Sequence, residues 1–280
     1  MDGDYIDNPN YERSFCSEFE ERGYGDMHGG HTIVTGGFEN VHITHVELSR
    51  LGQPTLARYP LHWHMVGEVG HNAGYEDPTY FESNSIHRSF SRFVTVHAAN
   101  GTRVADNVGY DSVGHGYFLE DGIEVRNTFE HNLGMVIRPG IILPSDRSTK
   151  FCTKTGDAQP VNGPNGWEAQ NAAKGCGGGS VFWISNIQND FNNNAAVGGD
   201  TCYWLIPHIF ENYTPPHPYH QHVLNQLAPW TKNKASACNK GLFVEDRVCE
   251  ECPFLDKYEN VAKFGIIEGQ SQKQDEIVTL

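Results

Sequence analysis

Short apolar segments recur along the middle of the chain, separated by clusters of glycine, asparagine and aspartate. Within them apolar and polar positions alternate, as in β-strands with one buried face. They follow one another at intervals of about 18–23 residues, a period typical of stacked repeats. The segments span residues 41–46, 59–66, 93–97, 116–120 and 133–137.

Three consecutive stretches line up with one another: residues 84–97, 104–121 and 125–138. Each has an apolar strand, a polar corner of Asn or Ser, and a second apolar strand. A right-handed parallel β-helix builds every coil in this way, with inward side chains stacked in columns along the axis. We therefore predict an all-β fold, a right-handed parallel β-helix over residues 28–245 with long loop excursions.

The flanks of this region are acidic and weakly patterned. Residues 1–27 carry a charge of −6 and residues 241–280 carry −5, which leaves −4 of the total of −15 for residues 28–240. We expect residues 1–27 to be a loosely ordered lead-in and residues 246–280 to be an acidic tail. This charge balance does not favour nucleic-acid binding.

The N-terminus has neither a basic n-region nor an apolar h-region, and no apolar run reaches the length of a membrane span. We expect no signal peptide and no membrane span within this chain. Residues 28–149 hold eight Arg and no Lys. Arg presents a planar fork that suits carboxylates, although these side chains also suit a simple acidic surface.

The seven cysteines and two sequons indicate an extracellular context. Cys152 and Cys176 bracket a loop rich in Gly, Asn and Pro, which is a sensible place for a disulfide. The triplets at Asn100 and Asn212 predict N-glycosylation. The pairing of the other cysteines stays open.

Strand alternation places several histidines on one outer face. If Leu61, Trp63 and Met65 point inward, His62 and His64 point outward. The same reasoning applied to the neighbouring segments adds three further outward side chains to this patch. Imidazole and carboxylate groups suit a divalent transition metal such as zinc, and the alternative is a row of solvated histidines. The predicted metal ligands are His42, His62, His64, His87 and Asp106.

A second outer column follows from the same register. With Val94/Val96, Tyr117/Leu119 and Met135/Ile137 inward, His97, Glu120 and Arg138 occupy equivalent positions. Glycoside hydrolysis requires a carboxylic acid beside the scissile bond, and Asp121 follows Glu120 directly. The predicted catalytic residues are therefore Glu120, Asp121 and His97. The alternative is a surface ladder of ion pairs.

Several longer motifs resemble the β-helix of the cell surface hyaluronidases and of the cell-migration-inducing, hyaluronan-binding proteins. The resemblance extends over residues 28–245, and fibrocystin-type proteins have a related β-helix. The motifs occupy residues 58–67, 85–97, 114–127, 143–147, 182–183 and 192–198. Gly116 stands where the close relatives carry Cys.

The resemblance implies an extracellular or cell-surface β-helix that binds and depolymerises hyaluronan or a related glycosaminoglycan, with calcium dependence in the membrane-anchored member. We expect Glu120 or Asp121 to be the acid and the sugar's acetamido group to be the nucleophile. Arginines then clamp the sugar carboxylates: Arg88, Arg92, Arg126 and Arg138. A non-catalytic module of the fibrocystin kind is the alternative, and a polysaccharide lyase is the third possibility.

Overall fold

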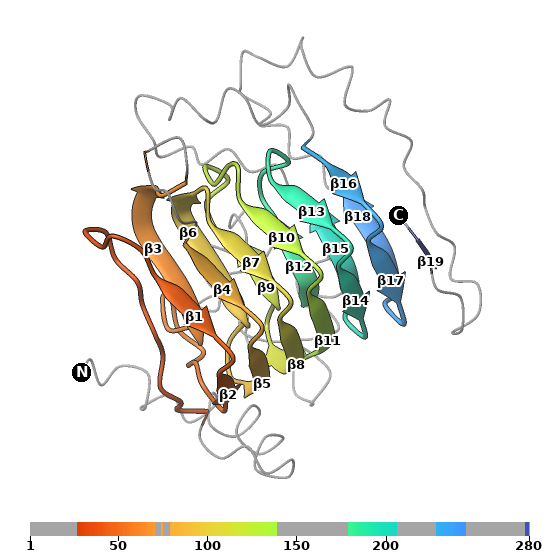
Figure 1. Ribbon diagram of the computed structural model, residues 1–280. Helices are drawn as coiled ribbons and strands as arrows, with labels where there is room; N and C mark the ends of the chain where they lie inside the picture. The colour runs from red at the N-terminus through yellow and green to blue at the C-terminus, as the bar shows by residue number, and fades with distance from the viewer. Residues whose placement is uncertain are drawn as a thin grey trace, which may run out of the picture.

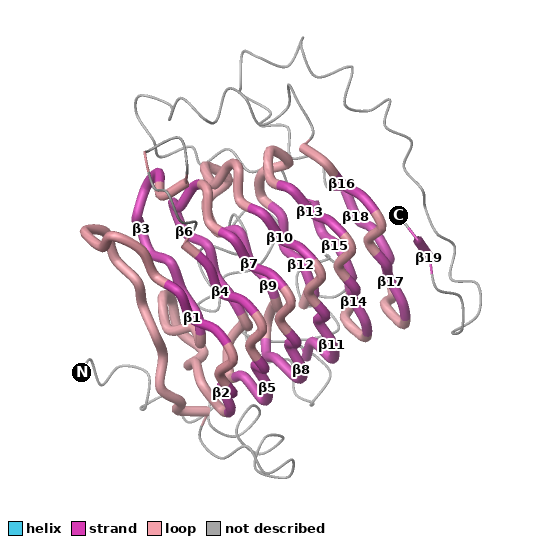
Figure 2. The backbone as a smooth tube through the Cα atoms, in the orientation of Figure 1, coloured by secondary structure: helices cyan, strands magenta, loops and turns pink. Residues whose placement is uncertain are grey.

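The structure is a computed structural model that describes residues 27–70, 74, 79–138, 179–205, 228–244 and 278–279. In this part of the chain the regular structure is entirely β, with nineteen strands and no helix. Figures 1 and 2 show the strands lying side by side in layers along one axis. No helix within the described residues has the length and apolar character needed to cross a membrane.

The strands form three sheets, which we call sheets A, B and C. Sheet A contains β3 (Leu61–Glu68), β6 (Val94–Asn100), β9 (Tyr117–Leu119), β12 (Ser180–Ile184), β15 (Thr201–Leu205) and β18 (Lys240–Val244). Sheet B contains β1 (His42–Thr44), β4 (Tyr80–Glu82), β7 (Arg103–Ala105), β10 (Thr128–Glu130), β13 (Asp190–Asn192) and β16 (Trp230–Thr231). Sheet C contains β2 (Glu47–Ser49), β5 (Ser85–Ser89), β8 (Val108–Val113), β11 (Leu133–Arg138), β14 (Ala195–Val197), β17 (Lys234–Ser236) and β19 (Val278–Thr279).

Each coil of the chain gives one strand to sheet A, then one to sheet B, then one to sheet C. Leu61 of β3 pairs with Val94 of β6, which in turn pairs with Tyr117 of β9. These pairings are parallel, as are all the strand pairings of the described residues except that of β19 with β17. The predicted parallel β-helix is thus confirmed.

Inward side chains from successive coils stack on one another to form the core. The ring of Tyr117 stacks on Phe182, which stacks on Tyr203, with centroids 4.8 and 4.9 Å apart. Phe129 and Phe191 stack in the same way at 4.7 Å. Each coil contacts only its neighbours, so the stability of such a repeat protein depends on the interfaces between adjacent coils. Stacked aromatic rings contribute a large buried area to these interfaces.

Small residues on sheet C make room for these rings. The inward positions of adjacent strands β8 and β11 are Gly109 and Gly134. A side chain at Gly109 would collide with the ring of Phe93, and one at Gly134 would collide with Val181. The core is therefore asymmetric in section, with large side chains on sheet A and small ones opposite.

A row of buried asparagines joins sheets B and C. The side-chain NH₂ of each donates to a backbone carbonyl of the preceding coil and, in all but the last, to the Oδ1 of the asparagine one coil further on. Each is preceded by a residue with φ between 53° and 56°, or 57° for the last. The predicted polar corner is thus an amide ladder in which buried polar groups find partners. Its members are Asn84, Asn107, Asn132, Asn194 and Asn233.

Two residues predicted to point inward point elsewhere, because a residue of left-handed conformation interrupts each of their strands. Met65 has a φ of 53° and is 62% exposed, and the register of β3 on β6 shifts between His64 and Gly67. In β11, Val136 has a φ of 58°, so that Gly134 and Ile137 are buried while Met135 is not. A left-handed residue breaks the two-residue alternation on which the predictions for Met65 and Met135 depended.

The described residues contain one disulfide, between Cys202 and Cys238, whose Cα atoms are 5.7 Å apart. The predicted pair, Cys152 and Cys176, lies outside the described residues. The predicted lead-in and tail also lie almost entirely outside them, so those domain boundaries stay predictions.

Candidate functional site

The outer face of sheet A brings three predicted functional residues onto adjacent coils. Trp63, Val96 and Leu119 point inward at equivalent positions of β3, β6 and β9. The residues that follow, His64 and His97, are also paired, and Glu120 comes directly after Leu119. The register predicted for His97 and Glu120 is therefore correct, because β6 and β9 alternate regularly up to these two residues.

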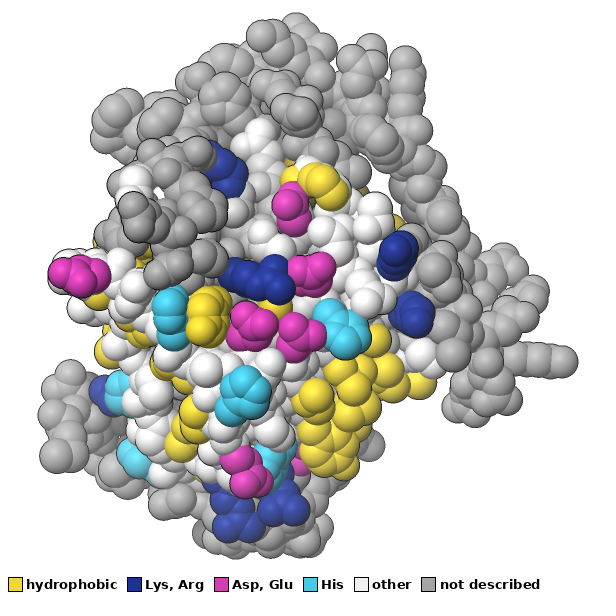
Figure 3. All heavy atoms as spheres, viewed as in Figure 1, with side chains coloured by type: hydrophobic (Ala, Val, Ile, Leu, Met, Phe, Trp, Pro, Cys, Tyr) yellow, Lys and Arg dark blue, Asp and Glu magenta, His cyan; other side chains and the backbone are white. Residues whose placement is uncertain are grey.

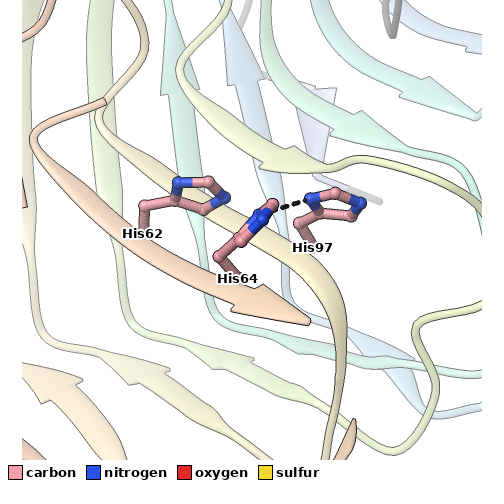
Figure 4. A group of neighbouring side chains, drawn as sticks. All are labelled: His62, His64 and His97. Atoms are coloured by element: carbon pink, nitrogen blue, oxygen red, sulfur yellow. Dashed lines mark hydrogen bonds between the residues drawn. The ribbon is translucent and has the colours of Figure 1, made fainter. Parts of the chain in front are cut away.

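His97 is the centre of this group. Its Nε2 lies 2.7 Å from Asp121 Oδ2, and its Nδ1 lies 3.7 Å from Glu120 Oε2 and 2.9 Å from His64 Nδ1. Figure 4 shows the ring of His64 directed at His97, with His62 on the other side of His64. The side chains of Glu120 and Asp121 are only 4% and 12% exposed, so the electrostatic interactions among these groups are only weakly screened.

His62 lies two residues before His64 on β3, opposite Thr95 of β6. Its ring is parallel to that of His97, 7° apart in orientation, and meets His64 edge-on with centroids 5.1 Å apart. The residue is fully buried on the outer face of the sheet. Within the described part of the chain, neither ring nitrogen of His62 makes a hydrogen bond of normal geometry.

The surroundings of His62 and His64 favour their neutral forms. Burial, followed by the charges of His64 and His97, lowers the pKa of His62 to about 3, although the backbone of Ala57 opposes the change. Burial and the neighbouring His97 also lower the pKa of His64, while Asp121 acts in the opposite direction. Both rings are therefore neutral at neutral pH, and each has one nitrogen with a lone pair.

The charge of His97 is favoured instead. Burial acts to lower its pKa, but the hydrogen bond to Asp121 and the charges of Glu120, Asp121 and Glu124 outweigh burial and raise the pKa to about 9. The resulting imidazolium donates from Nε2 to Asp121 and from Nδ1 to the neutral His64.

A turn stabilised by Glu124 carries the two acidic residues. The Glu124 carboxylate accepts hydrogen bonds from the backbone N–H groups of Ala98, Asp121 and Gly122, at 2.7–3.2 Å. Gly122 has a φ of 80°, a conformation that glycine adopts easily. Burial, and then the charge of Asp121, raise the pKa of Glu124 to about 7, against the effect of these hydrogen bonds. Glu124 is not among the sequence-predicted site residues, although it follows Glu120 by four positions.

The predicted five-residue histidine patch is wrong as a group. His42 lies on β1 in sheet B, where its ring stacks on Tyr80 at 4.1 Å. His87 lies on β5 in sheet C and pairs with Glu47, and Asp106 forms its ion pair in the corner between sheets B and C. The prediction treated successive strand segments as neighbours, whereas two strands of the other sheets intervene before the chain returns to the same sheet.

Sheet B, which carries His42, has a mixed surface. Arg103 lies between Glu82 and Glu130, with N–O distances of 3.8 and 2.7 Å. Figure 3 shows charged side chains of both signs and histidines intermingled across the visible face. Ion pairs at such exposed positions contribute little free energy and create no distinct binding site.

The four predicted sugar-clamping arginines do not gather in one place. Arg92 is buried, with its guanidinium 3.3 Å above the ring of Phe118, and so is not available to a polysaccharide. Arg88 is exposed on β5 of sheet C.

The other two arginines form ion pairs. Arg138, at the end of β11 in sheet C, binds Asp111 at 2.6 Å, and the predicted alignment of Arg138 with His97 and Glu120 is therefore wrong. Arg126 pairs with Glu68, the last residue of the strand that carries His62 and His64. Among the four, Arg126 is the one that an ion pair links to the site-bearing sheet.

The Asn100 sequon does not suit this structure as a glycan site. Asn100 is 6% exposed, and its Oδ1 accepts a hydrogen bond from the backbone of Val125. Thr102 is buried as well and bonds to Asn127. The second sequon, at Asn212, lies outside the described residues.

In sum, this part of the molecule offers two chemistries at one place. A buried carboxyl group beside an imidazole can exchange protons with a substrate. His62, His64 and His97 could also hold a metal ion, because one ring nitrogen from each lies within 4.8 Å of the other two.

Comparison with known proteins places the chain in a family. The chain is 42% identical over 210 residues to the cell surface hyaluronidase of Danio rerio, and 41% identical over 199 residues to the human cell surface hyaluronidase CEMIP2. It is 38% identical over 247 residues to the human cell migration-inducing and hyaluronan-binding protein. These alignments cover 72%, 71% and 85% of the chain, but only 14%, 14% and 17% of the relatives. Residues 27–242 match the family model described as the CEMIP β-helix, and the chain therefore belongs to that family.

Proposed function

We propose that this β-helix binds hyaluronan outside the cell or at its surface and depolymerises it by hydrolysing glycosidic bonds, with the help of a divalent metal ion. The observation that carries the proposal is the contact of His97 with the two largely buried carboxyl groups of Asp121 and Glu120 on the outer face of sheet A. The names of the relatives, cell surface hyaluronidase and hyaluronan-binding protein, support the choice of polymer and location.

Each of these three residues has a role in the proposed reaction. Glu120, in its protonated form, donates its proton to the glycosidic oxygen as the bond to the sugar carbon breaks. The acetamido oxygen of the same sugar attacks that carbon, and water then opens the cyclic intermediate. Asp121 orients His97 through the 2.7 Å hydrogen bond, and the His97 charge lies close enough to Glu120 to stabilise the carboxylate left behind.

Calcium, which the family resemblance implies, does not suit the histidine group. Ca²⁺ prefers six to eight oxygen ligands, whereas His62, His64 and His97 offer imidazole nitrogen. We therefore derive no step of the reaction through calcium.

A non-catalytic glycan- or protein-binding module is the second candidate. It is favoured by the low exposure of Glu120, whose side chain is only 4% accessible, because a buried acid reaches a sugar bond only after some local opening. This candidate predicts saturable hyaluronan binding with no change in polymer length.

The test is incubation of the full chain with hyaluronan of high molecular mass, read by size exclusion. We expect the polymer to shorten, and Glu120→Gln to slow the reaction by about 10²–10⁴-fold. Glu47→Gln is the matched control, since Glu47 is exposed on sheet C. Unchanged polymer length would refute hydrolysis, and products that absorb far-ultraviolet light as unsaturated uronates would indicate a lyase instead.

A further inference from the structure

We propose that His62, His64 and His97 form a three-imidazole site for a late first-row transition metal ion such as Zn²⁺, with a fourth position facing Glu120. The inference deepens the metal dependence of the proposed function and rests on that function only for what the ion does. Binding of the ion itself is a property of the protein without sugar, so the two proposals can fail separately.

The spacing of the three rings is close to that of a tetrahedral site. Bonds of about 2.0–2.1 Å at tetrahedral angles place ligand atoms about 3.3 Å apart. The Nδ1 atoms of His64 and His97 are 2.9 Å apart, and the ligand atoms of all three rings lie within 4.8 Å. Small side-chain rotations bring them to equal distances from one ion, because His62 and His64 share a strand that is paired directly to the strand of His97.

An independent observation at His62 indicates a missing ligand. Both of its ring nitrogens are buried, and within the described residues neither makes a hydrogen bond of normal geometry; the backbone of Ala57 interacts with one of them and leaves the other for a ligand. A buried polar group in this state destabilises the fold until a ligand satisfies it. A bound metal ion satisfies the unprotonated nitrogen of a neutral imidazole. The unprotonated nitrogen of a second imidazole cannot do so, because it has no hydrogen to donate.

The acidic residues have the positions expected around such an ion. Asp121 accepts a hydrogen bond from His97 Nε2, which fixes the orientation of the ring and leaves Nδ1 as the metal-binding atom once the ion displaces the proton that Nδ1 otherwise donates to His64. Glu120 Oε2 lies 3.7 Å from that same Nδ1. A water molecule or a substrate oxygen in the fourth position would therefore lie next to the Glu120 carboxylate.

The ligand set also indicates which ions the site accepts. Imidazole suits Zn²⁺, Cu²⁺, Ni²⁺ and Co²⁺, whereas Mg²⁺ and Ca²⁺ prefer oxygen. Three neutral or neutralisable nitrogens beside buried carboxylates give a site of the open, catalytic type rather than a closed structural one.

The test is direct binding of Co²⁺ and Zn²⁺ to the tag-free, chelator-stripped full chain. We expect about one ion per chain, visible absorption typical of tetrahedral Co²⁺, and displacement by Zn²⁺ but not by excess Ca²⁺. We expect Asp121→Asn to weaken binding by about 10–100-fold and His64→Gln to weaken it further, while both variants retain the β-sheet circular dichroism of the wild type. Glu120→Gln is expected to retain the ion.

The matched control is His42→Ala, which removes a histidine from sheet B and is expected to bind the ion as the wild type does. No saturable binding by the wild type would overturn the inference. Equal loss in His42→Ala and His64→Gln would overturn the assignment of ligands, as would a Ca²⁺ affinity that exceeds the Zn²⁺ affinity.

Discussion

At the scale of single residues, Glu124 shows how the site turn is maintained. Its carboxylate accepts three backbone N–H groups from two segments, and in doing so it fixes Asp121 relative to His97. The same burial that makes these hydrogen bonds strong also disfavours the charge of the carboxylate. Glu124 thus couples the local architecture of the site to pH.

We expect the variant Glu124→Gln to remove a pH-dependent contribution to stability. The pKa of Glu124 is about 7 in the fold against 4.5 ordinarily, so the fold favours the protonated form. The stabilisation is complete below pH 4.5 and is lost as the pH rises towards 7. At 1.36 kcal/mol for each pKa unit, the loss amounts to about 3 kcal/mol.

The measurement is the free energy of urea unfolding of both proteins between pH 4 and pH 8, without metal. Relative to the variant, the wild type should weaken across this range by up to about 3 kcal/mol. Because the charge of Glu124 contributes to the raised pKa of His97, the comparison is repeated in the His97→Ala background, where that contribution is absent. Parallel pH profiles would contradict the account of Glu124.

At the scale of elements, small residues on sheet C are matched to large ones on sheet A. Gly109 of β8 faces the Phe93 ring, and no side chain has room there. The strands of different sheets are therefore coupled through the core, although the backbone ladder of each strand lies within its own sheet.

We expect Gly109→Ala to lower the free energy of unfolding by about 1–3 kcal/mol through overpacking. Combining it with Phe93→Leu should cost less than the sum of the two single changes, because the smaller side chain removes the clash. Chemical denaturation of the four proteins measures this coupling. Gly36→Ala is the control, since no atom lies within 4 Å of a methyl group there, and additive effects at Gly109 and Phe93 would disprove the contact.

The elements also show what sequence reasoning can reach. Regular alternation in β6 and β9 correctly predicts that the side chains of Val94, Val96 and Leu119 are buried. It therefore also places His97 beside Glu120. It fails at Met65, because nothing in an apolar–polar pattern marks a left-handed non-glycine residue. It fails for His42 as well, because the repeat length alone does not indicate that three strands, rather than two, make up a coil.

At the scale of the whole molecule, stability is propagated from coil to coil. The pairings join each coil only to the one before and the one after it. A stack of this kind opens most easily at its ends. The Cys202–Cys238 disulfide lies near one end of the described stack and joins β15 to the residues after β17 of the same coil.

We expect the double variant Cys202→Ala/Cys238→Ala to lose about 3–4 kcal/mol of unfolding free energy, because the bond closes a loop with a sequence separation of 36 residues. Thermal and urea unfolding measure the loss. A reducing agent should then destabilise the wild type by more than it destabilises the double variant. Equal stability of the two oxidised proteins would show that the bond contributes nothing.

The asparagine ladder has a practical consequence for engineering. Every described connection from sheet B to sheet C is two residues long, whereas the connections that begin or end at sheet A vary widely in length. The B–C edge therefore acts as a rigid spine that tolerates no insertion, since one added residue would displace an amide from its ladder. The connections around sheet A form a variable rim beside His97 and Glu120. New recognition loops should be grafted at this rim, where added length leaves the spine intact.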